Sequence, residues 1–402
     1  MYDIVIVGGG IVGLSTGMAL LEMFPNYKLA VVEKEDQVAK HQTGHNSGVI
    51  HSGIYYKPGS LKARLAKKGC AETVAFCEKH DIPYDRCGKV IVATQEKELP
   101  LLQALYERGL QNELELKRLS VAEMKEIEPH LEGIDAIHVP STGIVNFKLV
   151  SRKYADIIKE RGGEIILSTE VTSIRDKGDG VYIGTTNGTI KSNFVINCGG
   201  LHCDRVARKA NIATDVKIVP FRGEYFELTE EKRHLCKHLI YPVPNPDFPF
   251  LGVHFTRMID GRILVGPNAV LGLKREGYKK TDISLTDLAE TLTYPGFWKV
   301  ASANMKEGVK EVVRSLSKNV LVKELQRFIP SVTKEDLLPA KAGVRAQALD
   351  RNGKLIDDFL MIHNKRMVHV LNAPSPAATA SIEIGRHIAS EVSKVHKPVE
   401  LI

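Results

Sequence analysis

The first 34 residues constrain the fold more than any other part of the chain. A β-branched run at residues 3–7 is typical of a buried parallel strand, and it leads into the glycine motif GGGIVG at residues 8–13. An apolar helical pattern follows, and a second strand over residues 28–32 ends at Glu33. This order of strand, glycine turn, helix, strand and acid predicts a dinucleotide-binding unit.

Each position of the motif has a physical role in that prediction. Gly8 allows the tight turn, Gly10 lets the backbone approach a pyrophosphate, and Gly13 lets the helix pack close to the strand. The amides and dipole at the helix start favour phosphates, and the spacing of Glu33 suits a ribose hydroxyl. A turn in an ordinary α/β core is the alternative. The consecutive glycines and the hydroxyl side chains after them disfavour a membrane span.

Composition limits the classes of function. The 402 residues suffice for two lobes, and the net charge of +7 fits an anionic substrate, an acidic membrane surface or no special partner. The six cysteines have neither Cys-x-x-Cys nor zinc spacing, so we expect reduced thiols, no metal site and a cytoplasmic location. A core strand almost at the first residue predicts no signal peptide. We find no nucleic-acid motif, and the sequence carries no signal for an oligomeric state.

The stretch HQTGHNSGVIHSGIYY at residues 41–56 has an unusual composition. It combines three histidines, small hydroxyl residues and glycines with a pair of tyrosines. Small residues let backbone amides approach a flat ligand closely. A solvated surface loop is the alternative, but the Val49–Ile50 pair and the tyrosines favour burial. We therefore predict a loop that contacts a cofactor.

The pattern of the remaining chain predicts two interleaved lobes. Helical periodicity covers residues 61–80, 96–112, 120–128 and 148–161, and a hairpin is expected around Asn187-Gly188. The strand at residues 194–200 ends in a glycine pair, which assigns it to the first sheet. From residue 219 to 267 the alternation has period two, which is typical of an antiparallel sheet. The predicted fold class is α/β, with a Rossmann-like lobe interleaved with an α+β lobe on that antiparallel sheet.

The last third of the chain contains three further features. Residues 274–318 are predicted to be helical, basic and interspersed with aromatics. A solvated helical insert is the favoured interpretation, and peripheral contact with anionic lipid is the alternative. Residues 340–347 form a turn or strand that carries Lys341 and Arg345. Residues 373–381 form a loop of small residues that opens the last helix.

Four motifs together resemble the FAD-dependent D-amino-acid oxidase and glycine oxidase superfamily, and within it the branch that oxidises L-2-hydroxyglutarate. They are GGGIVG at residues 8–13, HNSGVIHSGIYY at 45–56, FRGEYF at 221–226 and PSPAATAS at 374–381. The resemblance covers essentially the whole chain and implies noncovalent FAD. It implies an FAD-binding lobe of residues 1–85, 141–215 and 320–402, and a substrate lobe of residues 86–140 and 216–319.

The resemblance also implies which residues hold FAD. The pyrophosphate and ribose are expected on Gly8, Gly10, Gly13, Glu33, Gly199 and Gly200. The adenosine is expected beside Lys34 and Val171. The isoalloxazine is expected along the loop Thr43, His45, Asn46 and Ser47, under Gly343, Ser375, Ala377 and Thr379.

Oxidation of a 2-hydroxy acid requires a C2 hydrogen directed at flavin N5, a base for the hydroxyl proton and cations for the carboxylates. His51 and His254 are the candidate bases, unranked, while His45 could instead bond the flavin; a structural role is the alternative for any one of them. Arg345 is the candidate anchor for the C1 carboxylate, with a surface ion pair as the alternative. Further candidate donors to the dicarboxylate are Tyr55, Tyr56, Arg222, Tyr241 and Lys341.

Several functions remain open at this point. A related flavin enzyme could act on an amine, an amino acid or glycerol phosphate. A nicotinamide-dependent dehydrogenase is less well supported, since the loop at residues 373–381 has no role there. A flavin-bound scaffold without turnover is a third class. Oxygen or a membrane quinone could accept the electrons, and the quinone would fit a peripheral position on the inner face of the membrane.

Overall fold

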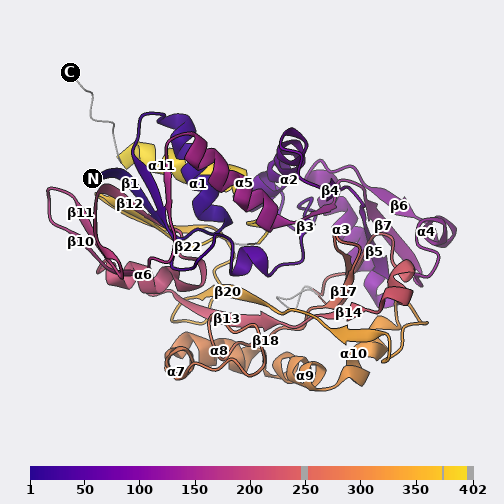
Figure 1. Ribbon diagram of the computed structural model, residues 1–402. Coiled ribbons are helices and arrows are strands. Elements are labelled where there is room, and N and C mark those ends of the chain that lie inside the picture. Colours follow the sequence, from indigo (N-terminus) through magenta and orange to yellow (C-terminus); the bar gives the residue numbers. More distant parts are fainter. Residues whose placement is uncertain (246–251, 374, 396–402) are drawn as a thin grey trace.

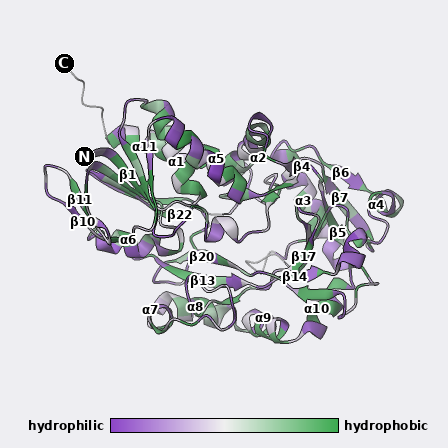
Figure 2. Ribbon diagram, viewed as in Figure 1, coloured by the Kyte–Doolittle hydropathy of each residue, from purple (hydrophilic) through white to green (hydrophobic). Residues whose placement is uncertain are grey.

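A computed structural model of the protein describes residues 1–245, 252–373 and 375–395. It contains two large β-sheets, one near each end of an elongated molecule, and a long antiparallel ribbon between them (Figure 1). Helices cover the outer faces, and Figure 2 shows hydrophobic residues along the strands at the centre of the first sheet. The predicted α/β class is confirmed.

The first sheet contains the N-terminal strand and has the order β10-β11-β12-β1-β2-β9, with β22 beside β12 and β21 beside β22. The strands that pair in parallel are β1 (Tyr2–Val7), β2 (Leu29–Val32), β9 (Glu164–Ile166), β12 (Gly188–Asn197) and β22 (Met367–Asn372). The antiparallel additions are β10 (Val171–Asp176), β11 (Val181–Thr185) and β21 (Leu360–Asn364). The register pairs Ile4 with Phe194, so the later strand returns to the first sheet as expected.

Helices bury both faces of this sheet because its central strands are apolar on both sides. Ile4 and Ile6 pack towards one helical layer, and Val5 and Val7 pack towards the opposite face. The helical layer is α1 (Ile11–Met23), α5 (Phe147–Glu160) and α11 (Ser381–Val395), with α2 (Leu61–Lys79) beside α11. The short helix α6 (Cys203–Lys209) lies on the opposite face.

The second sheet has the order β19-β14-β17-β16-β15-β5-β7-β6. Its strands are β5 (Lys89–Ala93), β6 (Lys117–Leu119), β7 (Asp135–Val139), β14 (Phe226–Leu228), β15 (Leu239–Pro242), β16 (His254–Arg257), β17 (Ile263–Gly266) and β19 (Leu337–Pro339). All neighbours are antiparallel except β5 and β15, which run parallel. The predicted antiparallel sheet is therefore present, with one parallel pair that the pattern did not predict.

Alternation gives this second sheet two different faces. Val90, Ile240 and Phe255 belong to a core that includes α10 (Lys318–Leu325), with α4 (Val121–Ile127) also on that side. Ile91 and Tyr241 face the other way, towards α3 (Leu99–Gln111). The second face is the one that reaches the cavity described below.

The central ribbon joins the two halves of the molecule (Figure 1). It consists of β13 (Lys217–Gly223) and β20 (Gly343–Leu349), with β18 (Val270–Leu271) on the edge of β13. A small sheet of β3 (Val49–Ile50), β8 (Gly143–Val145) and β4 (Tyr84–Asp85) lies nearby. The helices α7 (Leu285–Leu292), α8 (Pro295–Ala303) and α9 (Met305–Leu316) lie beneath the ribbon in the view of Figure 1.

Two expectations about the last third differ from the structure. Residues 274–284 are not helical, because the Asp282 carboxylate accepts from the amides of Tyr278 and Lys279 and closes a turn instead. Residues 320–339, which we expected in the FAD-binding lobe, contribute α10 and β19 to the second sheet and its core. The division of the whole chain into two lobes stays a proposal.

Candidate active site

A cavity of about 1010 Å³ lies between the first sheet, the central ribbon and the second sheet. Residues from all parts of the chain line it, from the glycine motif near the N-terminus to the loop before α11. A volume at the upper end of ordinary ligand sites suits an extended cofactor together with a small substrate.

The glycine motif forms one wall of this cavity, and Gly8 and Gly10 both line it. Gly8 has a φ of 111°, and a Cβ atom there would lie 2.5 Å from the carbonyl oxygen of Cys198. A Cβ atom on Gly13 would overlap the Gly8 carbonyl oxygen, so only glycine lets α1 pack this close to β1. The tight turn and close packing predicted for these two glycines are therefore present.

The start of α1 is open towards the cavity. Gly10 is the N-cap and provides no side-chain hydrogen bond to the helix. The Ile11 amide donates to Thr43 Oγ1 at 3.0 Å, which ties the histidine-rich loop to this helix end. A Cβ atom on Gly10 would contact only Thr43 Oγ1, at 3.6 Å, so the space in front of the helix is free for a ligand.

Glu33 lies at the end of β2 and lines the cavity as expected. Its carboxylate accepts from the Gly9 amide at 2.7 Å and from the Glu35 amide at 3.0 Å. The backbone thus fixes the orientation of this acid beside the glycine turn. Lys34, Val171, Gly199 and Gly200 line the same end of the cavity.

The loop after β2 runs close to the central ribbon. Asn46 organises the loop, because its amide donates to the carbonyls of Gln42 and Thr43 and its oxygen accepts from the Gly48 amide. His45 Nδ1 donates to the His41 carbonyl, and burial lowers the pKa of His45. Thr43, His45, Asn46 and Ser47 all line the cavity, as do Gly343, Ser375, Ala377 and Thr379.

His51 lies where this loop meets the loop before α11. Its amide donates to Thr379 Oγ1 at 3.1 Å, and Thr379 Oγ1 donates to the Val49 carbonyl at 3.2 Å. His51 lines the cavity. Burial, followed by the charges of Lys89, His254 and Arg345, holds the pKa of His51 well below its usual value, so the imidazole is neutral near pH 7.

His254 lies on β16, on the face opposite Phe255, and its ring packs against Tyr241 with 4.0 Å between centroids and 31° between the ring planes. Its Nδ1 donates to the Gly252 carbonyl at 2.8 Å. Burial, with the charges of Lys89 and Arg345, lowers the pKa of His254 to about 3. Because a carbonyl oxygen only accepts, the proton of this neutral imidazole is on Nδ1, and Nε2 carries a lone pair.

Arg345 lies on β20, opposite Phe221 of β13, and lines the cavity near the two histidines. Tyr55, Tyr56 and Tyr241 line the same region, as predicted. The structure thus brings the three expected catalytic residues and these tyrosines into one cavity. Sequence reasoning did not single out Tyr225 and Lys62, which also line it: Tyr225 belongs to the FRGEYF motif but was given no role of its own, and Lys62 lies in no motif.

Two expected substrate-binding residues lie outside the cavity lining. Arg222 is buried, and its guanidinium pairs with Glu224 at 2.7 Å and donates to the Lys279 carbonyl at 2.9 Å. Lys341 is exposed and precedes the strand that carries Arg345. Neither residue lines the cavity, because alternation along β13 directs Arg222 to Glu224 and Lys341 precedes β20, so a substrate-binding role for either stays a prediction.

A segment that we call the strap, residues 272–284, closes over the nucleotide end of the cavity. Its Glu276 pairs with Lys34 at 2.7 Å, His41 at 3.1 Å and His202 at 3.3 Å. Burial raises the pKa of Glu276, but the bonds to His202 and Lys34 outweigh it and bring that pKa down to about 2. Tyr278 stacks on His45 with 3.8 Å between centroids. Sequence reasoning missed the strap because it predicted a helix there.

The cluster of Glu35, His41 and Glu276 has ligand atoms within 4.8 Å of one another. Lys34 Nζ pairs with both carboxylates at 2.7 Å, so these charges are already compensated by an ammonium. We therefore interpret the cluster as an ion-pair network, and the expectation of no metal site stays a prediction.

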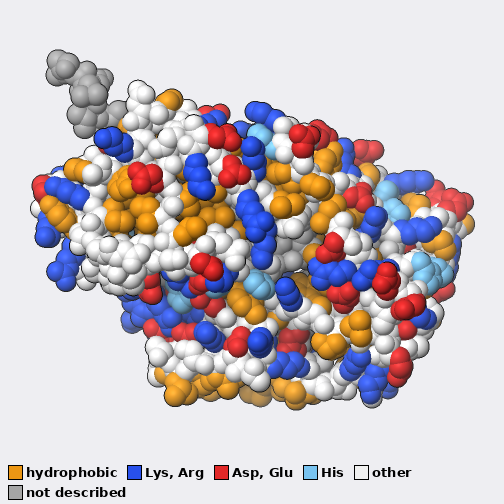
Figure 3. Space-filling model, in the orientation of Figure 1, with side chains coloured by type: hydrophobic (Ala, Val, Ile, Leu, Met, Phe, Trp, Pro, Cys, Tyr) orange, Lys and Arg blue, Asp and Glu red, His pale blue; other side chains and the backbone are white. Residues whose placement is uncertain are grey.

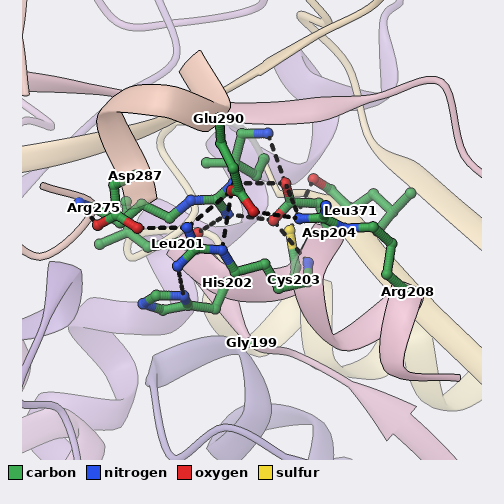
Figure 4. Close-up of polar contacts among 12 residues, drawn as sticks. Gly199, Leu201, His202, Cys203, Asp204, Arg208, Arg275, Asp287, Glu290 and Leu371 are labelled. Carbon is green, nitrogen blue, oxygen red and sulfur yellow. Dashed lines mark hydrogen bonds and ion pairs between the residues drawn. The ribbon is translucent and has the colours of Figure 1, made fainter. Parts of the chain in front are cut away.

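A buried ion-pair network anchors the strap to α6 (Figure 4). Arg275, 2 % exposed, donates to Asp204 and to the Leu201 carbonyl, and it lies 3.1 Å from Glu290 of α7. Arg205 pairs with Asp287 and Glu290 from the other side. The strap and α7 are therefore fixed to the first sheet through charges that water cannot easily screen.

The lining fits an FAD molecule. An uncapped helix start and a glycine turn without side chains suit a pyrophosphate, and an oriented carboxylate at the end of β2 suits a ribose. The loop at residues 43–47 offers flat, partly buried backbone next to a neutral histidine pair. Arg345 also lines this cavity, and its guanidinium suits a small carboxylate.

Comparison with known sequences agrees with this assignment. The sequence profile of a family described as FAD dependent oxidoreductase matches residues 3–391. The chain is 52 % identical to L-2-hydroxyglutarate dehydrogenase of Indibacter alkaliphilus over 386 residues, covering 96 % of this chain and 97 % of the relative. It is 48 % identical to the enzyme of the same name in Escherichia coli K12, covering 98 % and 93 %. It is 47 % identical to the mitochondrial L-2-hydroxyglutarate dehydrogenase of Homo sapiens, covering 98 % and 89 %.

Solved structures are similar over nearly the whole chain. L-α-glycerophosphate oxidase from Mycoplasma pneumoniae, with FAD bound, has a TM-score of 0.78 at 25 % identity, covering 98 % of this chain and 94 % of that one. Glycine oxidase from Geobacillus kaustophilus has a TM-score of 0.73 at 20 % identity, covering 100 % and 96 %, and shares the fold.

Proposed function

The chain belongs to the family of FAD-dependent oxidoreductases, and from that premise we propose that it oxidises L-2-hydroxyglutarate to 2-oxoglutarate. The observation that carries this proposal is the convergence of His51, His254 and Arg345 at the end of the cavity away from Glu33. Two neutral imidazoles beside a guanidinium suit a substrate with a hydroxyl next to a carboxylate. The names of the relatives with 46 to 52 % identity support the same substrate.

The chain's own residues have separate roles in this reaction. Arg345 binds the C1 carboxylate with its planar guanidinium, and the hydroxyls of Tyr55 and Tyr56 donate to the substrate. His254 accepts the C2 hydroxyl proton at Nε2, while the Gly252 carbonyl fixes its tautomer. His51 is the alternative base, since it also lines the cavity.

Bound FAD supplies the acceptor for the two electrons and the hydrogen that leave C2. Gly8, Gly10 and Gly13 form the turn for its pyrophosphate, Glu33 orients the ribose, and Thr43 to Ser47 line the flavin region. The strap excludes water from the nucleotide end, where Glu276 neutralises Lys34.

Anaerobic titration of the purified yellow protein tests the proposal. Addition of L-2-hydroxyglutarate bleaches the visible flavin absorbance, and 2-oxoglutarate appears in equal amount. The control substrates are the D-enantiomer, glycine, L-proline and glycerol 3-phosphate. Bleaching by an amine or by glycerol 3-phosphate alone would replace the substrate assignment and leave the cofactor assignment intact.

We also propose that the electrons pass to a membrane quinone and that the enzyme contacts the membrane peripherally on its cytoplasmic side. No helix in the described ranges is long and apolar enough to cross a membrane. The support comes from α7 to α9, whose apolar side chains point outwards. Figure 3 shows them along the lower edge of the molecule. The exposed large apolar residues there are Ile283, Leu285, Leu292, Trp298, Met305, Val309, Val312, Val313 and Leu316.

An ordinary surface helix buries its apolar stripe, whereas α9 exposes it. Met305, Val309, Val312 and Leu316 recur on an exposed stripe, whereas Glu311 is buried and accepts from the Ala269 amide. Exposed lysines surround this stripe, among them Lys280, Lys306 and Lys310. An apolar stripe with a basic rim suits an anionic lipid surface. Oxygen consumption measured against reduction of a soluble quinone separates the two candidate electron acceptors.

A further inference from the structure

Lys89 occupies a position in the second sheet where alternation calls for an apolar residue. It is the first residue of β5, and it lies on the same face as Ile91 and Ala93. On β15, Leu239 and Tyr241 continue this face. Lys89 is 0 % exposed, and a fully buried lysine is rare unless it is paired.

The ammonium of Lys89 has aromatic neighbours in place of a counterion. Its Nζ lies 4.5 Å from the ring centroid of Tyr241 and 5.0 Å from that of Tyr55. Within the described part of the chain, Nζ has no hydrogen-bond partner and no carboxylate forms an ion pair with it. Tyrosine faces stabilise a cation only partly, so a nearby anion would stabilise the Lys89 ammonium further.

Both tyrosines that hold Lys89 also form the cavity wall at the catalytic end. His254, which also lines the cavity, packs against Tyr241, and Lys89 lies over the same ring. Lys89 itself does not line the cavity, so one layer of aromatic side chains separates it from the substrate.

We propose that Lys89 is a positioning residue, whose buried ammonium draws the carboxylates of the substrate into the histidine-lined end of the cavity through the rings of Tyr55 and Tyr241. The inference rests on the proposed function, since it requires an anionic substrate. In this arrangement the carboxylates of the substrate provide the counterion that the Lys89 ammonium does not have in the free enzyme. Lys89 therefore favours the dicarboxylate before Arg345 has formed any hydrogen bond with it.

The free enzyme holds Lys89 between two charge states. Burial lowers its pKa to about 7 from the ordinary 10.5, so the neutral amine and the ammonium are both populated near neutral pH. The titratable or charged groups that face it are Tyr55 and His51 from the loop, Cys70 from α2, Cys87, Tyr241 from β15, His254 from β16 and Arg345 from β20. All the charged forms among the histidines and the arginine are cationic, so an incoming dianion raises the pKa of Lys89 and the complex takes up a proton.

Isothermal titration calorimetry of the oxidised holoenzyme with glutarate tests this inference. Glutarate has the five-carbon dicarboxylate skeleton but no hydroxyl to oxidise. Titration at pH 7 in two buffers of low and high ionisation enthalpy measures the number of protons taken up on binding. The wild type is expected to take up a measurable fraction of a proton per glutarate.

Two variants separate charge from structure. Lys89→Met keeps an unbranched side chain, one atom shorter, but removes the charge, so glutarate binds roughly 10- to 100-fold more weakly and without this proton uptake. Lys89→Arg keeps a permanent charge, so glutarate binds within a few-fold of wild type, again without proton uptake. If Lys89 had only a structural role, Lys89→Arg would not keep the affinity for glutarate while losing the proton uptake.

The flavin spectrum and the thermal unfolding midpoint of each holoenzyme verify that the variants are folded. If Lys89→Met binds glutarate like the wild type, or if it retains the proton uptake, the inference is overturned and the histidines carry the coupling. The wild-type measurement decides the matter even if a variant does not fold, because absence of proton uptake between pH 6 and 8 also overturns it. Failure of L-2-hydroxyglutarate to bleach the flavin is a separate result that overturns the proposed function.

Discussion

Gly343 passes so close to the backbone of His45 that a Cβ atom on residue 343 would lie 2.6 Å from the His45 carbonyl oxygen. This contact fixes the histidine-rich loop against the central ribbon at the level of the predicted flavin site. A methyl group there must displace the loop or the strand. Gly343→Ala is expected to lower the stability of the holoenzyme by about 1–3 kcal/mol and to weaken FAD binding at least tenfold.

FAD content after gel filtration and thermal unfolding measure this effect. Gly308→Ala is the matched control, because it lies in α9 and a Cβ atom there has nothing within 4 Å. That control should stabilise its helix slightly and leave FAD binding unchanged. Full FAD affinity in Gly343→Ala would contradict the steric argument.

The proposed base predicts a loss of the chemical step. His254→Ala is expected to lower the rate of anaerobic flavin reduction by roughly 10²- to 10⁴-fold, and more than His51→Ala does. Stopped-flow spectroscopy at saturating L-2-hydroxyglutarate measures both rates. His363→Ala, at the exposed position of strand β21, serves as the control and should retain the wild-type rate. A larger loss in His51→Ala would transfer the role of base to His51.

The pKa of His254 predicts the acid side of the pH profile. A base must be deprotonated, so kcat/KM falls as the pH drops through the pKa of the base in the free enzyme. Burial and the charges of Lys89 and Arg345 lower that pKa to about 3, below the ordinary value of 6.5. The wild type is therefore expected to retain kcat/KM well below pH 6.5, down to the acid limit of folding. In Lys89→Met this acid limb should move upward in pH, because one of the nearby positive charges is gone.

Replacement of Arg345 is predicted to weaken substrate binding, whereas replacement of the nearby Lys341 is not. Arg345→Gln is expected to raise KM for L-2-hydroxyglutarate by roughly 10²-fold, because the carboxylate loses two charge-assisted hydrogen bonds. Lys341→Gln, four residues earlier and exposed, should change KM less than twofold. Steady-state kinetics with a soluble dye acceptor measure both constants. Equal effects in the two variants would indicate a long-range charge effect instead of direct binding.

The membrane proposal predicts a defect limited to lipid binding. Leu285 and Leu316 are 81 % and 79 % exposed, so the double variant Leu285→Glu, Leu316→Glu should fold normally but bind anionic liposomes at least tenfold more weakly. Flotation at low salt measures binding, and kcat with a soluble dye should not change. Ile134→Glu introduces a charge at an exposed apolar residue elsewhere and is the control. Liposome binding by the double variant at the wild-type level would remove the proposal.

The burial of Lys89 also predicts that this residue lowers the stability of the folded protein. The folded state lowers the pKa of Lys89 to about 7 from 10.5, so the unfolded state binds more protons between these values. The cost to stability is complete below about pH 7 and disappears as the pH rises towards 10.5. Lys89→Met is therefore expected to be more stable than wild type, by about 1–4 kcal/mol at pH 7, and the difference should shrink by pH 10. Chemical denaturation at both pH values measures this difference.

The nucleotide end of the site could be predicted because local sequence determines it. Gly8, Gly13 and Glu33 act through backbone conformation and short-range spacing, and these two features can be recognised from the sequence alone. His254 was also predictable, since alternation with Phe255 fixes its face once β16 is recognised.

The remaining site depends on contacts between distant segments. Lys89 precedes a run of β-branched residues and looks like an exposed strand end, and only the pairing of β5 with β15 buries it. Arg222 looked like a substrate anchor, but Glu224 two residues later on the same face compensates its charge. The strap looked helical by composition, whereas side-chain bonds from Asp282 and the pairing of Glu276 with three distant residues determine its course.

The pairing of Glu276 with Lys34, His41 and His202 has a consequence for the lifetime of the holoenzyme. A cofactor that lies behind the strap leaves only after these contacts break together. The buried ion pair of Arg275 beside them opposes opening of the strap by stepwise loss of single contacts. We therefore expect the retention of FAD during dilution to depend on how rarely the strap opens and not on the equilibrium affinity alone. The same barrier makes cofactor loading a step that belongs with folding of the chain, before the strap has closed.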